Sequence, residues 1–295
     1  MANLKEVRTR ITSVSSTQQI TSAMKMVSAA KFRRAQMAII GMRPYAAQLG
    51  EIVADIDTGG EVQTPYHSRR PLRNVLVVVI TSNKGLCGAF NSNVIKQAQA
   101  RIEHFRKTLP TDGQIHVISI GKKSSEMLAR QQDLKITVCD EILDAPTFDS
   151  IARMADGIMD EFATKQLDYV EVVYNQFKNS LTQVLTTEQW LPVAPKDIKD
   201  SKDHKETKNN DYIYEPTKEE IVRNLIPLTL RSTFYRMVLD SLAAEHGARM
   251  TAMQKATDNA SELLKDLRLS YNKARQAAIT NEIIEIVSGS EALKG

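Results

Sequence analysis

Residues 228–288 contain no proline and a single glycine, Gly247. One continuous helix over that stretch would be roughly 90 Å long at a rise of about 1.5 Å per residue, which is far longer than a small domain is wide. Residues 1–43 have the same composition bias, with no proline and one glycine, Gly41. We therefore expect a long helix at each end of the chain, the two paired antiparallel, with a compact domain inserted between them.

Apolar and small side chains recur in steps of three and four in both end segments. Such steps average about 3.5 residues and keep one seam turned toward a partner helix, as in a left-handed coiled coil. The alternative is an ordinary helical bundle, but bundle helices seldom exceed about 25 residues without caps. We expect the seam to contain Leu4, Val7, Ile11, Val14, Gln18, Thr21, Met24 and Ser28 in the first segment and Met253, Ala256, Ala260, Leu263, Leu267, Tyr271, Ala274 and Ala278 in the last.

Composition is that of a globular protein with room for two domains, since the chain has 295 residues, of which 42% are apolar and 25% charged. The longest fully apolar run, residues 75–80, is too short to span a bilayer. Cys87 and Cys139 are too far apart in sequence for a metal or redox motif, and so few cysteines favour a reducing compartment.

The net charge of +4 is unevenly distributed. Residues 1–43 hold eight basic side chains against Glu6 alone, so the rest of the chain is slightly acidic. A basic helical rod can bind nucleic acid, an acidic membrane surface or acidic protein surfaces, and charge alone does not choose among them.

The middle of the chain alternates between strand and helix patterns. The run at residues 72–81 is apolar on both faces, as expected for the centre of a covered sheet. Alternation of this kind, closed by a hairpin, predicts an α/β layer with a mostly parallel sheet and one antiparallel edge. We expect strands at 72–81, 114–120, 135–141, 168–177 and 181–189, and helices at 93–108, 124–132 and 148–165, the last opened by Pro146 and Thr147.

These patterns predict a Rossmann-like domain inserted into a long two-helix coiled coil. We expect the coiled-coil segments at residues 1–60 and 216–295 and the α/β domain at 70–215. Residues 196–211 carry five lysines and five acids and form a solvated, mobile loop in this interpretation. Pro227 should kink or break the last helix before its long segment begins.

The loop at residues 81–91 follows a strand and precedes a helix, where phosphate-binding loops lie. It fits neither the Walker pattern nor GxGxxG. Cys87 has no histidine nearby in sequence to activate it. A structural or contact loop is therefore favoured over a nucleotide-binding or catalytic one, with Lys84, Gly85, Leu86, Cys87 and Gly88 as its contact residues.

No catalytic, cofactor or metal motif stands out. The five histidines lack ligand spacing, and HExxH, CxxC and GxSxG are absent. This favours mechanical or scaffolding work. Two rivals remain open: an enzyme with a Rossmann-like domain, which would bind nucleotide tightly, and a coiled-coil protein that binds duplex DNA with steep salt dependence. An apolar surface at the C-terminal helix end indicates a protein contact instead, formed by Ile283, Ile284, Ile286, Val287 and Leu293.

Three segments resemble the γ subunits of bacterial F-type ATP synthases. They read ITSAMKMVSAAKFRRAQ near the N-terminus, TSNKGLCGAFN in the middle, and ARMTAMQKATDNASELL leading into YNKARQAAITNEIIEIVSGSEAL at the C-terminus. The resemblance covers essentially the whole chain. The chain lacks the paired cysteines that photosynthetic members insert, so no thiol switch is expected.

The resemblance implies a non-catalytic rotor shaft that turns inside an α3β3 ring and couples proton or sodium flow through a c ring to ATP synthesis. The implied partners are the α, β and ε subunits and the c ring, with no nucleic acid, and the implied location is the cytoplasmic face of the inner membrane. An apolar sleeve should enclose the apolar helix end. Rotor–stator contacts are implied for Arg275, Gln276, Thr280, Glu282 and Glu285, with Met24 and Lys25 facing the same region from the N-terminal helix.

Overall fold

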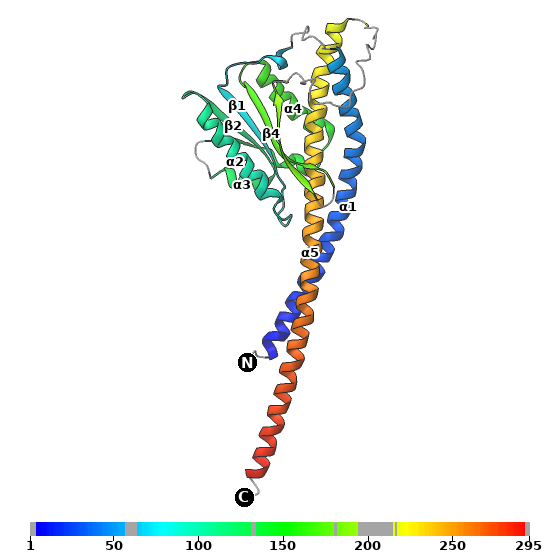
Figure 1. Cartoon of the computed structure of the whole chain (residues 1–295), viewed down its shortest axis with the longest axis vertical. Coiled ribbons are helices and arrows are strands. Elements are labelled where there is room, and N and C mark those ends of the chain that lie inside the picture. The colour runs from blue at the N-terminus through cyan, green and yellow to red at the C-terminus, as the bar shows by residue number, and fades with distance from the viewer. Residues whose placement is uncertain are drawn as a thin grey trace, which may run out of the picture. The chain divides into compact units, whose positions relative to one another are not determined.

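The computed structural model describes residues 4–56, 64–130, 134–179, 182–193, 215 and 217–292 (Figure 1). It divides into two compact units. The two-helix unit comprises the described residues up to Ala29 and from Arg249 onward, and the sheet unit comprises the described residues from Ala30 to Ala248. The elements are α1 (Leu4–Ile56), β1 (Asn74–Ile80), α2 (Phe90–Thr108), β2 (Gln114–Ile120), α3 (Lys122–Leu128), β3 (Lys135–Val138), α4 (Phe148–Ala163), β4 (Tyr169–Phe177), β5 (Gln183–Leu191) and α5 (Lys218–Ala292), with 3-10 turns at Pro65–His67 and Asp140–Leu143.

The sheet unit holds five strands in the order β3-β2-β1-β4-β5. Strands β3, β2, β1 and β4 run parallel, and β5 pairs antiparallel with β4. This confirms the predicted Rossmann-like, mostly parallel sheet with one antiparallel edge. Strand β1 lies in the middle, where the all-apolar run Val75–Ile80 is covered on both faces.

Alternate residues of the strands pack into two separate cores. On one face Val75, Val77 and Val79 of β1 pack with apolar residues of α2. On the other face Leu76, Val78 and Ile80 join a larger core with α4, with Ile39 of α1 and with α5 (Figure 1). Since successive side chains of a strand point to opposite faces, the six apolar residues of β1 supply both cores.

Helix α4 begins where its sequence predicts. The side chain of Thr147 accepts a hydrogen bond from the Ser150 amide at 3.3 Å and so caps the helix. Strand β3 is shorter than expected, because the chain enters a 3-10 turn at Asp140. The charged stretch 196–211 lies outside the described residues.

Helix α5 begins at Lys218 and continues through Pro227, so of the kink or break expected at Pro227, the break is wrong. Proline removes one backbone hydrogen bond from a helix. Here the neighbouring turns are anchored because Val222, Ile226 and Leu230 are buried in the larger core. Tertiary packing therefore holds the helix where local propensity alone would end it.

The two-helix unit confirms an antiparallel pairing of α1 with α5. Gln18 Nε2 donates to Ser261 Oγ at 2.7 Å, and Thr257 Oγ1 donates to Thr21 Oγ1 at 2.9 Å. Residue numbers rise on one helix as they fall on the other, which defines antiparallel packing.

All eight expected seam positions of α1 are buried or half-buried. On α5 the seam is shifted at one point. Leu263 is 48% exposed, and Leu264 is buried in its place at 5% exposure. The observed path through Met253, Thr257, Ala260 and Leu264 keeps steps of four and three. Ala278 is exposed as well, so the paired part of the seam is shorter than predicted.

Candidate functional site

The carboxyl end of α5 extends beyond the part of the helix that α1 covers. The contacts of Gln18 with Ser261 and of Thr21 with Thr257 set the register of the two helices. The same register places Leu4, the first residue of α1, about level with Ala274. Figure 1 shows the end of α5 running past the N-terminal end of α1. Among the described residues, the last turns of α5 therefore have no helix to pack against.

Every described side chain from Arg275 to Glu291 is exposed. The predicted apolar residues of this end are therefore exposed in the chain where the structure describes them, whereas Leu293 lies outside the described residues. Large apolar side chains left in water on this scale indicate a protein contact. The exposed set includes Ile279 at 49%, Ile283 at 55%, Ile284 at 56%, Ile286 at 67% and Val287 at 52%, and the predicted polar contact residues Arg275, Gln276, Thr280, Glu282 and Glu285.

Met24 and Lys25 do not lie beside this helix end. Both are half-buried and face the paired part of α5, about level with Gln254. Arg275 is roughly 30 Å further along α5 at about 1.5 Å per residue. The expectation that the two groups face one region is wrong for the chain itself, because the antiparallel register carries α1 away from the end of α5.

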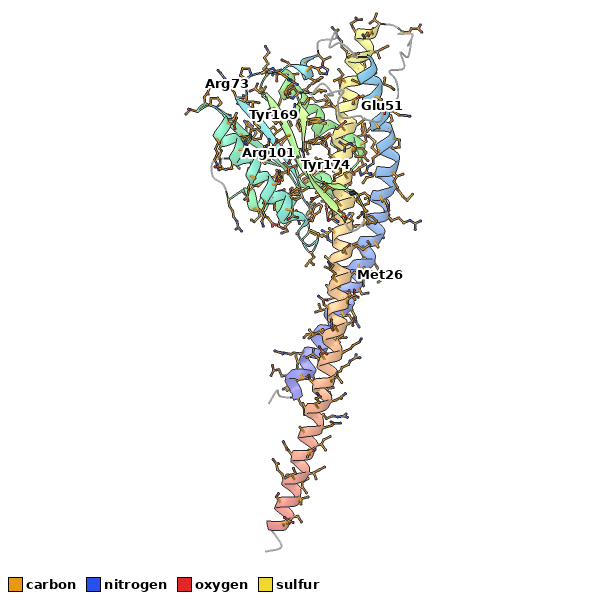
Figure 2. All side chains as sticks on the ribbon, in the orientation of Figure 1. Met26, Glu51, Arg73, Arg101, Tyr169 and Tyr174 are labelled. Carbon is orange, nitrogen blue, oxygen red and sulfur yellow. The ribbon has the colours of Figure 1, made fainter. Side chains whose placement is uncertain are left out.

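A second exposed apolar group lies on α1, off the predicted seam. Ile20 is 60% exposed, Met26 64% and Val27 58% (Met26 is labelled in Figure 2). The signal was present in the sequence, because these three apolar residues lie off the seam. An apolar residue off the buried stripe of a paired helix has no partner within the pair.

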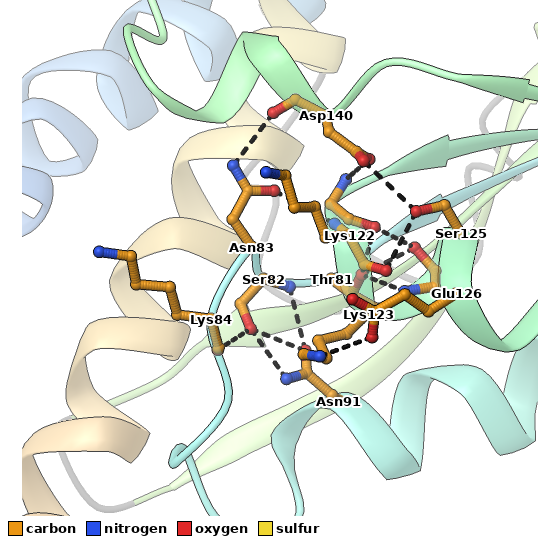
Figure 3. Close-up of polar contacts among 12 residues, drawn as sticks. Thr81, Ser82, Asn83, Lys84, Asn91, Lys122, Lys123, Ser125, Glu126 and Asp140 are labelled. Atoms are coloured by element: carbon orange, nitrogen blue, oxygen red, sulfur yellow. Dashed lines mark hydrogen bonds and ion pairs between the residues drawn. The ribbon is translucent and has the colours of Figure 1, made fainter.

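The loop after β1 is held by hydrogen bonds among its own side chains (Figure 3). Asn91 Oδ1 accepts from the Ser82 amide at 3.0 Å, and Asn91 Nδ2 donates to Ser82 Oγ at 2.8 Å. Ser82 Oγ also donates to the Lys84 carbonyl at 2.6 Å. Ser82, near the beginning of the loop, is thereby tied to Asn91 in the first turn of α2.

A second set of bonds fixes this loop to the neighbouring strand ends. Asn83 Nδ2 donates to the Asp140 carbonyl at 3.1 Å, and Asn83 Oδ1 accepts from the Lys122 amide at 3.1 Å. Asp140 Oδ1 in turn accepts from the Gly121 amide at 3.1 Å. The loop is thus part of a rigid layer at the carboxyl ends of β1, β2 and β3 (Figure 3).

Leu86 lies at the outer turn of this loop. It is 62% exposed with a φ of 64°, in the left-handed region that leucine rarely occupies. Gly88 also has a left-handed φ, of 62°. Strained backbone held by surrounding structure is concentrated at functional sites. An exposed leucine on such a loop suits a contact with another protein.

Cys87 is buried at 2% exposure, and its sulfur accepts a hydrogen bond from Asn91 Nδ2 at 3.2 Å. A buried thiol in this setting helps to pack the loop and is not presented to a substrate. Among the described residues, no group of three or more His, Cys, Asp or Glu side chains could hold a metal ion. In the same part of the chain, no helix is long and apolar enough to cross a membrane.

The described residues define an architectural class: a mostly parallel five-stranded sheet with two long paired helices, one of which has an exposed end. Comparison with known proteins identifies the family. A family model described as ATP synthase matches residues 3–293. The ATP synthase gamma chain of Flavobacterium psychrophilum is 53% identical, over 100% of this chain and 100% of the relative, and that of Flavobacterium johnsoniae is 52% identical over the same shares.

Solved structures agree in fold. A chain of the mitochondrial ATP synthase of Tetrahymena thermophila, from a structure of its central stalk and c ring, matches with a TM-score of 0.58 and 25% identity, over 80% of this chain and 99% of that one. A chain of the Euglena gracilis mitochondrial enzyme matches with a TM-score of 0.63 and 20% identity, over 98% and 94% of the two chains.

The chain belongs to the ATP synthase gamma chain family. Members of this family are non-catalytic rotor subunits of the central stalk, in a complex that associates peripherally with the membrane.

Proposed function

We propose that the exposed end of α5, from Arg275 to Glu291, is the part of the rotor that turns inside a ring of three α and three β subunits. The observation that carries this proposal is the length of helix whose described side chains are all exposed. A helix end that α1 leaves uncovered can be surrounded by a ring of other chains. The c ring on the membrane side would drive rotation by proton or sodium flow, and the β subunits would make ATP.

A single helix has no threefold symmetry, so at any angle it presents a different face to each of three β subunits. Each face would favour a different state of the subunit it meets. Shifting a two-state equilibrium from 1:99 to 99:1 takes about 5.5 kcal/mol of differential contact energy. A surface ion pair supplies about 1 kcal/mol at most, so several contacts must act together.

The polar and apolar residues of this helix end would have different roles. Arg275, Gln276, Thr280, Glu282 and Glu285 are exposed and can make directional bonds to loops of the β subunits. Residues 283–287 are richer in apolar side chains and would turn in an apolar sleeve, where non-directional contacts oppose rotation less than hydrogen bonds do. Met24 and Lys25 would meet the ring at a separate level, about 30 Å away along the rotor.

The sheet unit would bind the ε subunit and the c ring. Its rigid loop at Lys84, Gly85, Leu86, Cys87 and Gly88 offers one contact surface, because Leu86 is exposed on a fixed backbone. Both Flavobacterium relatives are bacterial, which supports a position on the cytoplasmic face of the inner membrane.

The helix-end proposal is tested by replacing Arg275 and Gln276 together with alanine in the assembled complex. ATP synthesis in membrane vesicles should fall at least several-fold while the amount of assembled complex is unchanged, because both side chains are exposed in the chain and do not support its fold. Arg130→Ala removes another exposed arginine, from the sheet unit, and serves as the control. Equal synthesis by the double variant and wild type would contradict the assignment.

The contact loop is tested by Gly85→Val. A Cβ at Gly85 meets no atom within 4 Å, and its φ is not left-handed, so the chain should fold normally. The added branched side chain should still lower assembly or coupling, because it changes the loop surface beside Leu86. A chain that fails to fold by circular dichroism, or a fully coupled complex, would count against a contact role.

A further inference from the structure

In the sheet unit, a buried carboxylate joins the two long helices. Asp240 of α5 has a side chain that is 0% exposed. Its Oδ1 accepts from Arg43 Nη2 of α1 at 2.7 Å, and its Oδ2 accepts from Arg236 Nη1, one turn earlier on α5, at 3.4 Å. The same Arg43 nitrogen donates to the carbonyl of Phe177, the last residue of β4, at 2.6 Å.

Arg236 extends this contact to the edge of the sheet. Its Nη2 donates to both carboxylate oxygens of Glu188 on β5, at 3.0 and 3.2 Å. Tyr174 of β4, labelled in Figure 2, donates its hydroxyl to Glu188 Oε2 at 2.8 Å. Arg43, Tyr174, Glu188, Arg236 and Asp240 therefore form one connected cluster across α1, α5, β4 and β5, which we call the charge clamp.

The charge clamp contributes little net stability for the desolvation free energy that it requires. Burying charges costs desolvation energy, and replacing a buried ion pair by apolar residues is often neutral or stabilising. Burial raises the pKa of the Asp240 carboxyl even though Arg43 and Arg236 both bond to it. Burial also raises the pKa of Tyr174 well above its ordinary value, which keeps its hydroxyl protonated as a donor to Glu188.

Such a cluster constrains the relative orientation of the elements that it joins. General apolar packing around it resists separation but depends little on rotation or sliding. The planar guanidinium of Arg236 bonds Asp240 through Nη1 and Glu188 through Nη2, so it loses bonds when either partner turns. Two arginines that share Asp240 hold both helices at one angle against β4 and β5.

We propose that the charge clamp is the torsional lock of the sheet unit, which keeps α1 and α5 at a fixed angle to the β4–β5 edge while torque passes through the unit. The proposal rests on the rotor function proposed for this chain. Arg43, Arg236, Asp240 and Glu188 are positioning residues in this role, since they touch no substrate.

The test uses complete ATP synthase carrying Glu188→Gln or Asp240→Asn, which keep the side-chain shapes but remove one charge each. The matched control is Glu171→Gln. Its partner Arg101 binds Glu171 Oε2 at 2.8 Å in a comparably buried ion pair, but that pair joins α2 to β4 and touches neither long helix.

Three kinds of measurement separate a lock from a merely stabilising contact. Hydrogen exchange of the α1 and α5 amides around the clamp should rise roughly tenfold or more in the two clamp variants, since a lost cluster of this kind opens locally. Single-molecule recordings should show a softer rotor, with a wider angular distribution under load. Protons pumped per ATP should fall as the opposing proton gradient increases, while unloaded ATP hydrolysis stays at the wild-type rate. Glu171→Gln should change none of these.

The effects of Glu188→Gln and Asp240→Asn should also be non-additive, because both act through Arg236. Wild-type stiffness in a folded clamp variant, or equal softening by Glu171→Gln, would overturn the proposal. A wild-type complex that does not couple rotation to synthesis would instead contradict the rotor function itself.

Discussion

Replacing Gly121 with alanine should strongly destabilise the sheet unit. Gly121 follows β2 with a φ of 111° and a ψ of 133°, a combination open almost only to glycine. An added Cβ would lie 2.4 Å from the carbonyl oxygen of Thr81 and 2.8 Å from its Oγ1. The Thr81 amide donates to the Ile120 carbonyl at 2.8 Å, so the ends of β1 and β2 cannot separate without losing a bond.

Two terms set the size of the effect. The backbone conformation costs about 1–3 kcal/mol for a residue with a side chain. Relieving the overlap requires a backbone shift in a packed region, which typically costs about 1–3 kcal/mol more. The expected loss is therefore about 4 kcal/mol, a large part of the roughly 5–15 kcal/mol that stabilises a typical domain. In a unit of this size each kcal/mol lowers Tm by about 2–4 °C, so Tm should fall by about 8–16 °C.

Thermal unfolding of the purified chain, followed by circular dichroism, measures this loss. Gly157→Ala is the matched control, because Gly157 lies inside α4 and an added Cβ meets nothing within 4 Å. Alanine there should be neutral or stabilising by up to about 1 kcal/mol, since glycine is a poor residue within a helix. If Gly121→Ala melts within about 2–3 °C of the wild type, which corresponds to about 1 kcal/mol, the reasoning from backbone geometry fails.

Three further predictions concern buried polar contacts. Glu171→Ala leaves Arg101 without its buried partner and should lower the free energy of unfolding by about 3 kcal/mol in urea titrations; an unchanged midpoint would refute this. Burial raises the pKa of Tyr174 above its ordinary value of 10.0, so the Tyr174 hydroxyl contributes fully to stability below pH 10.0, and this contribution is lost as pH rises through the folded-state pKa. The difference in unfolding free energy between wild type and Tyr174→Phe should thus be constant from about pH 7 to 9 and shrink above about pH 10. A difference that grows above about pH 10 would contradict the direction of the pKa shift. In the two-helix unit, Thr21→Val alone should destabilise by about 1–2 kcal/mol, and adding Thr257→Val should restore much of that loss in thermal melts, since both partners are then apolar.

Local patterns in the sequence predicted most elements of the fold. The strand at 114–120 was predicted with its observed ends, and the helix at 148–165 starts at its predicted capping residue, Thr147. Both depend on neighbours within a few residues, which is why a pattern can reveal them. The failures, at Pro227 and at Leu263, lie where distant segments decide. Burial of Val222 and Ile226 carries α5 through the proline, and the pairing with α1 turns Leu264 inward in place of its neighbour.

The candidate site likewise has parts that the sequence predicts and parts that depend on the tertiary structure. The sequence predicted the apolar helix end and the loop at Lys84–Gly88, because clustered isoleucines and two closely spaced glycines can be recognised from the sequence alone. It could not predict that Met24 lies far from Arg275, since that separation follows from the register of two helices more than 200 residues apart in sequence. It also gave no sign of the charge clamp, because Arg43, Glu188 and Asp240 look like ordinary surface charges until the fold brings them together and buries Asp240.

Periodicity and composition alone determined that this chain has two very long helices around an α/β domain, because apolar spacing is a local property that each segment carries by itself. Only the tertiary structure decided where the helices stop pairing, which strand ends hold the contact loop, and which charges leave water. Those outcomes depend on the free energy of contacts between residues far apart in the chain, and no single segment of the sequence contains that information.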